Sequence, residues 1–193
     1  MRIEKITNLS EVVKQVYAPE ERSLQFIPEI YNHTSQGAFY CHTPGLTIRK
    51  LSRSSTITSQ SDIIQLDDVC IFEKIFRRTA EKNIFQDRNL VDFNISSKEL
   101  ILKENPVIGR FDRAYSILGT NSQHWGHFIA EYFPSFFASL PFLPEDVVIV
   151  IPDNLDQIQI EFIKFALDYH SKENKIFVCP NNNSVLINEL YIL

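Results

Sequence analysis

Apolar side chains recur at helical spacing within Gly119–Leu140, which reads GTNSQHWGHFIAEYFPSFFASL. From Trp125 onward they fall three and four residues apart, at Trp125, Phe128, Ile129, Tyr132, Phe133, Phe136, Phe137 and Leu140. This spacing predicts a helix that buries one broad aromatic face against a sheet. The rest of the chain is organised around this stretch.

The opposite face of the predicted helix carries small residues and two side chains with chemistry. His127 and Glu131 are one turn apart, so both side chains project from the same side. A face of this kind suits the wall of a cleft. Asn121 or Ser122 is expected to cap the first amides, and Pro134 predicts a kink or break just before it, because proline has no amide hydrogen.

The clearest alternation of strand and helix follows. Val147–Ile151 is a continuous β-branched run, typical of a strand buried on both faces of a parallel sheet. Leu155–His170 repeats apolar residues on one face and predicts a helix capped by Asp153 or Asn154. Short connections between such elements indicate a layered α/β unit. Two further strands are predicted over Lys175–Cys179 and Ser184–Leu193.

The earlier part of the chain is richer in strand signals. A short amphipathic helix is predicted over Ser10–Tyr17, and Arg110–Leu118 predicts a strand that leads into the central helix. Between them, Ile63–Leu102 predicts a meander of short strands. Its runs are Val69–Phe72, Ile75–Arg78, Asn83–Gln86, Leu90–Ile95 and Glu99–Leu102. We therefore expect a poorly defined segment over residues 1–62 and a domain over residues 63–193.

Composition and charge exclude several classes of function. The 193 residues are 44% hydrophobic and 22% charged, which is ordinary for a globular domain. A net charge of -5 argues against binding to the phosphate backbone of a nucleic acid. No window reaches the ~20 apolar residues of a membrane span, and the N-terminus lacks the apolar region of a signal peptide. We expect a cytoplasmic protein whose three cysteines are reduced structural thiols.

Candidate chemistry is concentrated on the central helix. If the helix begins before His124, then His124, His127 and Glu131 would line one helical side and could bind zinc or iron, yet their spacing matches no standard metalloenzyme helix. The alternative is a structural His127 that hydrogen-bonds a carbonyl or Glu131. With five glycines, the chain has neither a Gly-rich phosphate loop nor a G-x-S-x-G elbow. The residue pattern alone predicts an α/β domain with a His/Glu helix lining a cleft.

The segment NSQHWGHFIAEYFPSF resembles the signature of glycosyltransferase family 61. The matching positions are Trp125, Gly126, His127, Phe128, Glu131, Phe133 and Pro134. The resemblance is strongest in Gly119–Leu140 and extends over about Ile63 to Leu193. It implies a Rossmann-like layered domain, preceded by a β-rich meander, that forms one half of a two-domain GT-B fold.

The resemblance also implies an activity, the transfer of a sugar from a nucleotide sugar to an acceptor hydroxyl, generally without a metal or other cofactor. In bacteria, such proteins are associated with capsular polysaccharide assembly. Glycosyl transfer needs a base near the acceptor hydroxyl, and His127 is the candidate to serve as that base or to position it, with Glu131 orienting the imidazole. The candidates for binding the glycan acceptor are Asn121, His124, Trp125 and Gly126.

The chain departs from the family pattern at its end. It stops where the second half of the fold would begin, so we expect an acceptor-side half with an exposed apolar edge or face near Leu193. The groups that bind the nucleotide sugar are then expected from a C-terminal half or a second chain. Two alternatives remain, a non-catalytic sugar-binding or interaction module and a His/Glu metalloenzyme.

Overall fold

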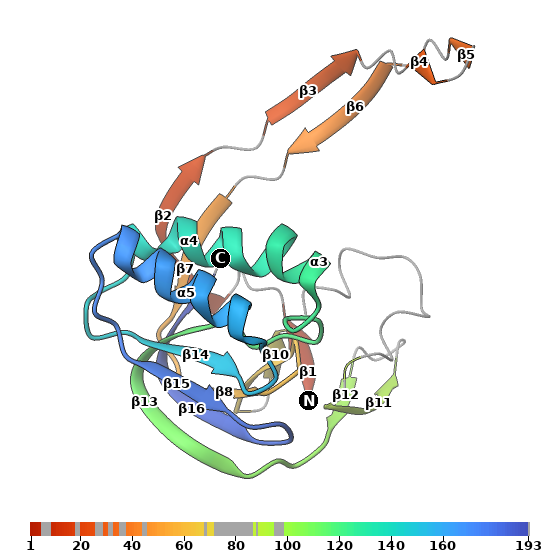
Figure 1. Ribbon diagram of the computed structural model, residues 1–193. Coiled ribbons are helices and arrows are strands. Elements are labelled where there is room, and N and C mark those ends of the chain that lie inside the picture. Colours follow the sequence, from red (N-terminus) through yellow and green to blue (C-terminus); the bar gives the residue numbers. More distant parts are fainter. Residues whose placement is uncertain are drawn as a thin grey trace.

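The protein, represented by a computed structural model, is a mixed α/β structure built mostly of sheet (Figure 1). The structure describes residues 1–4, 9–17, 20–25, 29–30, 33–34, 38–43, 46–67, 69–71, 87, 89–94 and 99–192. Most described strands belong to one 12-stranded sheet. Ten of them lie in the order β11 (Leu90–Asn94), β12 (Glu99–Leu102), β1 (Arg2–Glu4), β10 (Val69–Ile71), β9 (Ile64–Leu66), β8 (Ser55–Thr58), β16 (Ser184–Ile192), β13 (Val107–Ser116), β14 (Val148–Pro152) and β15 (Ile176–Cys179).

The remaining strands lie off this path. β2 (Glu11–Tyr17) pairs with β7 (Leu46–Leu51), and β7 pairs with β16. Two separate two-stranded sheets are formed by β3 (Glu20–Gln25) with β6 (Ala38–Thr43) and by β4 (Glu29–Ile30) with β5 (His33–Thr34). The predicted strands Ile75–Arg78 and Asn83–Gln86 lie outside the described residues.

The parallel part of the sheet is the one that the sequence predicts most directly. β16, β13, β14 and β15 are parallel neighbours. In β14, Ile149 and Ile151 belong to the core beneath the helices, while Val150 belongs to the core on the other face. This arrangement confirms a strand buried on both faces, because alternate side chains point to opposite sides of a sheet.

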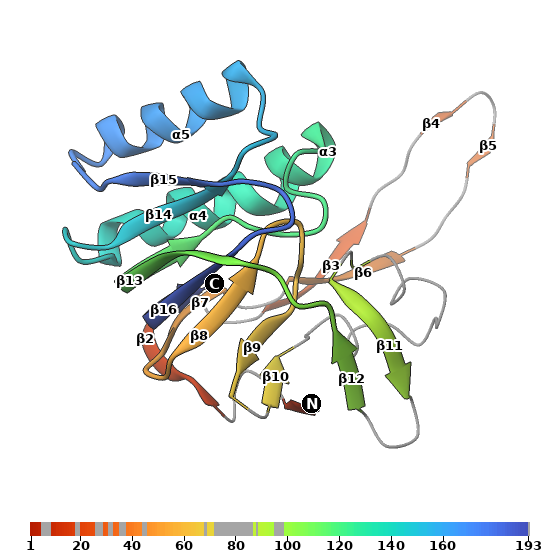
Figure 2. The same cartoon turned by 90° about the horizontal axis from the view of Figure 1, so that it is seen from below.

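The two longest strands of this part, β13 and β16, bend strongly, so the sheet curls (Figures 1 and 2). Phe111 in the middle of β13 packs edge-on against Phe177 of β15, with ring centroids 4.9 Å apart. A Cβ on Gly109 would lie 2.9 Å from the Phe111 ring and 3.1 Å from the Phe177 ring. The close approach explains a glycine inside a strand.

The last described strand, β16, occupies the middle of the sheet, and the prediction of an exposed apolar edge beside it is wrong. One edge pairs with β13, while the other pairs with β8 and then with β7. Its side chains Val185, Ile187 and Leu190 are fully buried. The physical reason is that strands from the start of the chain fold back and supply the missing hydrogen-bond partners.

The N-terminal part therefore belongs to the same sheet. The helix predicted over Ser10–Tyr17 is wrong, because Glu11–Tyr17 forms β2 and pairs with β7. Its three valines and its tyrosine favour an extended backbone, and a paired neighbour outweighs the weak helical periodicity. The strands predicted around Val69, Leu90 and Glu99 are confirmed as β10, β11 and β12. The predicted boundary at residue 62 falls between β8 and β9, which pair with each other.

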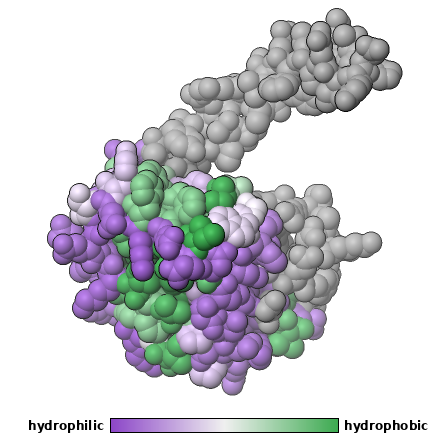
Figure 3. All heavy atoms as spheres, in the orientation of Figure 1, coloured by the Kyte–Doolittle hydropathy of each residue, from purple (hydrophilic) through white to green (hydrophobic). Residues whose placement is uncertain are grey.

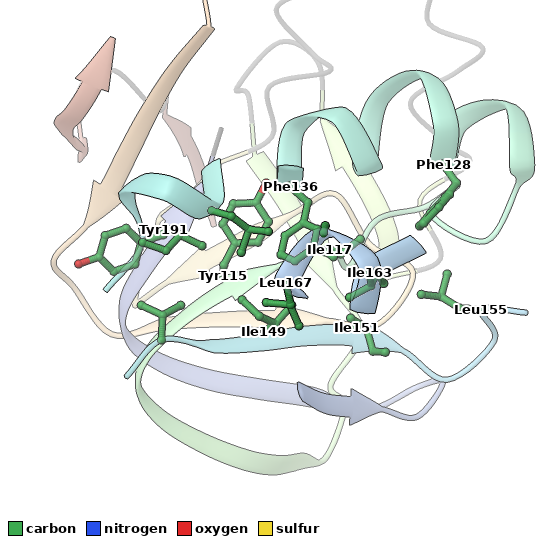
Figure 4. Packing of buried hydrophobic residues seen from close by; sticks show 14 residues of the cluster. Tyr115, Ile117, Phe128, Phe136, Ile149, Ile151, Leu155, Ile163, Leu167 and Tyr191 are labelled. Carbon is green, nitrogen blue, oxygen red and sulfur yellow. The ribbon is translucent and has the colours of Figure 1, made fainter. Parts of the chain in front are cut away.

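Two helical segments cover one face of the parallel strands (Figures 1 and 4). The first runs through α3 (Trp125–His127), the π-helical turn η2 (Phe128–Tyr132), α4 (Phe133–Ser139) and the 3₁₀ turn η3 (Leu140–Phe142), and the second is α5 (Gln157–Tyr169). Phe128, Phe136 and Leu140 are fully buried against the sheet. Each such side chain contributes roughly 1.5–3 kcal/mol through burial.

The predicted helix is confirmed over 125–139. The irregularity expected at Pro134 is a π-helical turn that lies just before the proline. In η2, the Phe133 N–H bonds the carbonyl of Phe128, one residue farther back than in an α-helix. Pro134, which has no amide hydrogen, follows at once, so the widened turn accommodates the proline without breaking the helix. Trp125 and Ile129 are exposed, against the expectation that both would be buried.

The predicted caps are wrong at both helices. The N-cap of α3 is His124, which makes no side-chain cap bond, because 120–123 forms a turn rather than the first helical turn. At α5, the cap is Asp156, whose side chain accepts from the Gln159 amide while the Gln159 side chain accepts from the Asp156 amide. This capping box lies two residues beyond the predicted Asn154.

The sequence predicts that the apolar residues of α5 share one face, but not all of them are buried. Its buried residues are Gln159, Ile163, Ala166 and Leu167, whereas Ile158 and Tyr169 are exposed. The helix is therefore rotated so that part of its apolar surface faces outward. Figure 3 shows apolar residues among hydrophilic ones over α4 and α5.

Gly119 marks the closest approach between the loop after β13 and the helix. A Cβ on Gly119 would overlap the hydroxyl and ring of Tyr132. Gly126 is the opposite case, because a Cβ there would meet no atom within 4 Å.

These two glycines give a matched test of the packing. Gly119→Ala should lower the free energy of unfolding by about 1–3 kcal/mol, because the Tyr132 ring must move. Gly126→Ala should leave stability unchanged or raise it by up to about 1 kcal/mol, because alanine favours the helix. Chemical denaturation followed by circular dichroism measures both. Equal effects of the two substitutions would contradict this packing.

Candidate functional site

The candidate residues gather where the parallel strands end. The loop over 119–124 follows β13, and 153–156 follows β14. Ligands of open parallel sheets bind outside the carboxyl ends of the strands, so this edge is where a site is expected. Gln159 joins the two loops, because its side-chain amide donates to the Gln123 carbonyl over 3.2 Å.

The His127–Glu131 pair has the geometry that the spacing predicts. Nδ1 of His127 lies 2.8 Å from a carboxylate oxygen of Glu131. The side chains are 43% and 60% exposed, so the pair faces solvent rather than the core. An exposed pair of this spacing stabilises a helix by only about 0.2–0.5 kcal/mol. The bond therefore fixes the position of the His127 ring but adds little to the stability of the fold.

The same bond determines which histidine nitrogen is free. With Nδ1 donating to the carboxylate, a neutral imidazole carries its lone pair on Nε2. A nitrogen in that state accepts a proton from a hydroxyl group. The pair can therefore act as a general base whose ring is oriented by Glu131.

His124 does not join the pair on one helical side, because the condition for it, a helix that begins before His124, is not met. Its backbone is extended, with φ -78° and ψ 123°, because the helix begins one residue later. The three side chains therefore do not share a helical face. Among the described residues, no group of three or more His, Cys, Asp or Glu side chains could hold a metal ion.

Trp125 is exposed at the helix start and is held in place. Its indole nitrogen donates to the second carboxylate oxygen of Asp156 over 2.7 Å, so one aspartate both caps α5 and fixes the indole. The Trp125 ring packs edge-on against Phe128 and Phe162. It is 41% exposed, which leaves apolar surface for a ligand. Gly126, which follows, is also exposed.

Asn121 is positioned through its backbone. Its carbonyl accepts from the His124 amide over 3.0 Å, and its backbone also hydrogen-bonds the Tyr132 hydroxyl. Burial, followed by the charge of Asp62, raises the pKa of Tyr132, so the phenol stays protonated. The Tyr132 hydroxyl donates to Asp62 over 3.4 Å.

A network of two aspartates supports this loop, and sequence reasoning missed it. Thr120 donates its hydroxyl to Asp62 over 2.5 Å and its amide to the same carboxylate over 3.2 Å. Asp87 is buried and accepts from Ser61 and from the amides of Asp62 and Asn89. Asp62 lies 25 positions from Asp87 and 58 positions from Thr120 in the chain, so no local spacing signals these contacts.

Two polar atoms near the site are buried without a partner, Oε1 of Gln123 and Oδ1 of Asn154. Each belongs to one of the two loops that follow β13 and β14. Buried acceptors without a donor are uncommon and are often satisfied by water or a ligand. They add hydrogen-bonding capacity at the edge that carries His127.

Two of the cysteines lie in the core as free thiols. Cys70 and Cys179 are free and buried, and burial raises the pKa of each thiol to about 11. Thiols with such values are almost wholly protonated at neutral pH, and the thiolate is the reactive form. This agrees with the predicted structural role of these two residues.

A cavity of about 590 Å³ lies away from the predicted residues. Its lining includes Thr58 of β8, Ser184 at the start of β16 and Val107 at the start of β13. His127 follows the opposite end of β13. The predicted cleft beside His127 is therefore a different place from this cavity and stays a prediction.

Comparison with protein-family models, curated proteins and solved structures returned no match. Within the described part of the chain, no helix has the length and apolar character to cross a membrane. The resemblance to glycosyltransferase family 61 stays an expectation from the sequence.

The aspartate network gives a test through Asp87→Asn. Each carboxylate oxygen of Asp87 accepts from one backbone amide, and an NH2 group in place of either oxygen cannot accept. The free energy of unfolding should therefore fall by about 1–3 kcal/mol. Burial raises the pKa of Asp87 above its ordinary 3.8. Folding therefore favours the protonated form, and the contribution of Asp87 to stability declines as pH rises through the folded value.

The stability difference between wild type and Asp87→Asn should accordingly narrow from pH 3.8 upward, measured by urea denaturation at several pH values. Asp112→Asn, at an exposed carboxylate, is the control and should change stability by less than about 0.5 kcal/mol. A difference that widens with pH would contradict the buried position of Asp87.

Proposed function

We propose that this chain is the acceptor-side part of a glycosyltransferase that resembles family 61. In this proposal, it moves a sugar from a nucleotide sugar to a glycan or other acceptor hydroxyl. The observation that carries the proposal is the solvent-facing His127–Glu131 pair, hydrogen-bonded over 2.8 Å beside the carboxyl ends of parallel strands. The signature residues around the pair support it.

The proposed step assigns each residue a role. The acceptor hydroxyl gives its proton to Nε2 of His127 while its oxygen bonds the anomeric carbon of the donor sugar. The bond between that carbon and the phosphate oxygen breaks, and the nucleoside phosphate leaves with the electron pair. Glu131 holds the imidazole by its Nδ1 hydrogen and stabilises the ring once it is protonated.

The finer fold assignment belongs to the same proposal. The unit from β13 through β15, with its helices on one face, is the part that we propose to correspond to a Rossmann-like half of a GT-B enzyme. The nucleotide phosphates require positive charge in the transition state. We propose that a C-terminal half or a second chain provides it, without a metal cofactor.

The test is a transfer assay on the gene product together with any downstream segment encoded in frame. UDP-, GDP- and CMP-sugars serve as donors with a panel of glycan acceptors. His127→Gln should lower kcat by about 10²–10⁴-fold, and Glu131→Gln should lower it less, because only orientation is lost. Ser135→Ala, one turn farther along the helix, should leave the rate unchanged.

Absence of transfer with every donor, or full activity of His127→Gln, would refute the proposed function. Circular dichroism of each variant separates a lost base from a lost fold. A larger loss in Glu131→Gln than in His127→Gln would contradict the assigned roles.

A non-catalytic sugar-binding module is the second candidate, and Trp125 is the observation that favours it. The indole is 41% exposed yet fixed by Asp156 and two phenylalanines. A rigid aromatic face provides apolar contact area at small entropic cost, and apolar C–H faces of sugars can stack on it.

In this reading, the wild-type chain binds glycans on an array without transferring sugar. Trp125→Ala should weaken that binding by about tenfold or more, because the aromatic platform is lost. Phe165→Ala, at an exposed aromatic of α5, is the matched control and should bind normally. Equal affinity of Trp125→Ala and wild type would exclude Trp125 as the platform.

A further inference from the structure

The cavity of about 590 Å³ at the opposite end of β13 has the size of a ligand site. Pockets for small molecules span about 300–1,000 Å³. It is lined by residues of β8, β9, β12 and β16 and by the link that leads from β12 to β13. Figure 2 shows this link passing from β12, near the N-terminus, to β13.

The floor of the cavity is a patch of uncharged hydrogen-bonding side chains on three adjacent strands. Thr56 lies opposite Gln65 of β9, and Thr58 lies opposite Ser184 of β16. Alternate residues of one strand share a face, so all four side chains lie on one side of the sheet. Their backbone positions are about 4.8 Å apart across strands and about 6.6 Å apart along β8.

Part of this hydrogen-bonding capacity is unused within the protein. The Thr58 and Ser184 hydroxyls are buried and bond each other over 2.8 Å, which uses only one of their two protons. Thr56 and Gln65 make no side-chain hydrogen bond with another described residue. Groups of this kind at the base of a cavity bind hydroxyl-bearing ligands.

The rest of the lining is partly apolar. Asn105 donates to the side chain of Asn89 over 2.5 Å and to the Lys103 carbonyl over 3.1 Å, which holds the link in place. Ile101 and Val107 are exposed and line the same cavity, with Val107 paired in register with Ser184. A ligand in the cavity can therefore meet both hydrogen-bonding groups and aliphatic surface.

Charge in the lining is nearly balanced. Lys103 and Glu104 carry opposite charges at neighbouring positions, and the Met1 ammonium donates to the Leu100 carbonyl over 2.8 Å. A cavity without a cluster of positive charge does not select phosphates or nucleotides. Its chemistry suits a neutral ligand with many hydroxyls and an apolar face.

We propose that this cavity is a second carbohydrate site, which binds a neutral oligosaccharide segment. It goes beyond the proposed transfer site, because it lies at the other end of β13 and uses none of the signature residues. The Thr56, Thr58, Gln65 and Ser184 side chains provide the hydrogen bonds. Ile101 and Val107 contact the C–H face of a sugar.

The experiment is a glycan array with neutral and acidic oligosaccharides, followed by titration calorimetry with a neutral oligosaccharide that binds. The double variant Thr56→Val/Gln65→Leu removes floor groups and keeps the buried Thr58–Ser184 bond. It should bind about tenfold or more weakly. Thr47→Val, on β7 outside the lining, is the matched control and should bind as wild type does.

Trp125→Ala separates this site from the proposed transfer site. Neutral-glycan binding that survives Trp125→Ala and falls in the double variant supports the second site, whatever the outcome of the transfer assay. Absence of neutral-glycan binding, binding restricted to acidic glycans, or binding lost in Trp125→Ala and kept in the double variant would overturn it. Thermal unfolding confirms that the variants are folded.

Discussion

Pairing between the two long parallel strands β13 and β16 is the interaction on which the rest of the structure depends. On one side of this pair, β14 and β15 complete the parallel unit, and on the other side β7 and β8 attach the N-terminal strands. Successive side chains of each strand point to opposite faces of the sheet, so the pair contributes to two different cores. Tyr115 and Tyr191 lie in the core beneath the helices, while Ala114 and Leu190 lie in the core on the opposite face.

An ionic ladder runs across the outer end of the same strands. Arg113 of β13 donates to Glu189 of β16 over 3.0 Å and to Asp146 over 2.9 Å. Lys50 of β7 extends the row, 3.9 Å from Glu189. Because these groups are partly exposed, water screens each pair and its contribution to stability is small. The backbone hydrogen bonds set the register of β13 and β16, and the two cores stabilise it. The ion pairs are compatible with that register.

The candidate site inherits its geometry from this framework. β13 delivers the loop over 119–124 to the carboxyl edge, where Asp62 holds Thr120 and Asp156 holds Trp125. The helix can then start at Trp125 and present His127 and Glu131 to solvent. The start of the helix that carries the candidate side chains is thus held by Asp62, between β8 and β9, and by Asp156, the N-cap of α5.

Local periodicity predicts much of this arrangement, because neighbours in sequence decide it. The strand around Val147–Ile151, the helix from Trp125 and the contact between His127 and Glu131 follow from spacing of two, three or four residues. The N-cap of α5 does not follow from local spacing. Several Asp and Asn residues precede this helix, and only tertiary contact selects Asp156. The aspartate network and the central place of β16 depend on partners 25 to 143 positions away, as in Asp62 bonded to Asp87 or Ile192 paired with Arg49.

The central claim is that Glu131 orients His127 with Nε2 free to accept a proton. A long-range ¹H–¹⁵N spectrum of the imidazole, recorded with the ring neutral, reports which nitrogen carries the hydrogen. The account predicts the Nδ1–H form in the wild-type chain and a shift toward the Nε2–H form in Glu131→Ala. A wild-type ring that carries its hydrogen on Nε2 would contradict the claim.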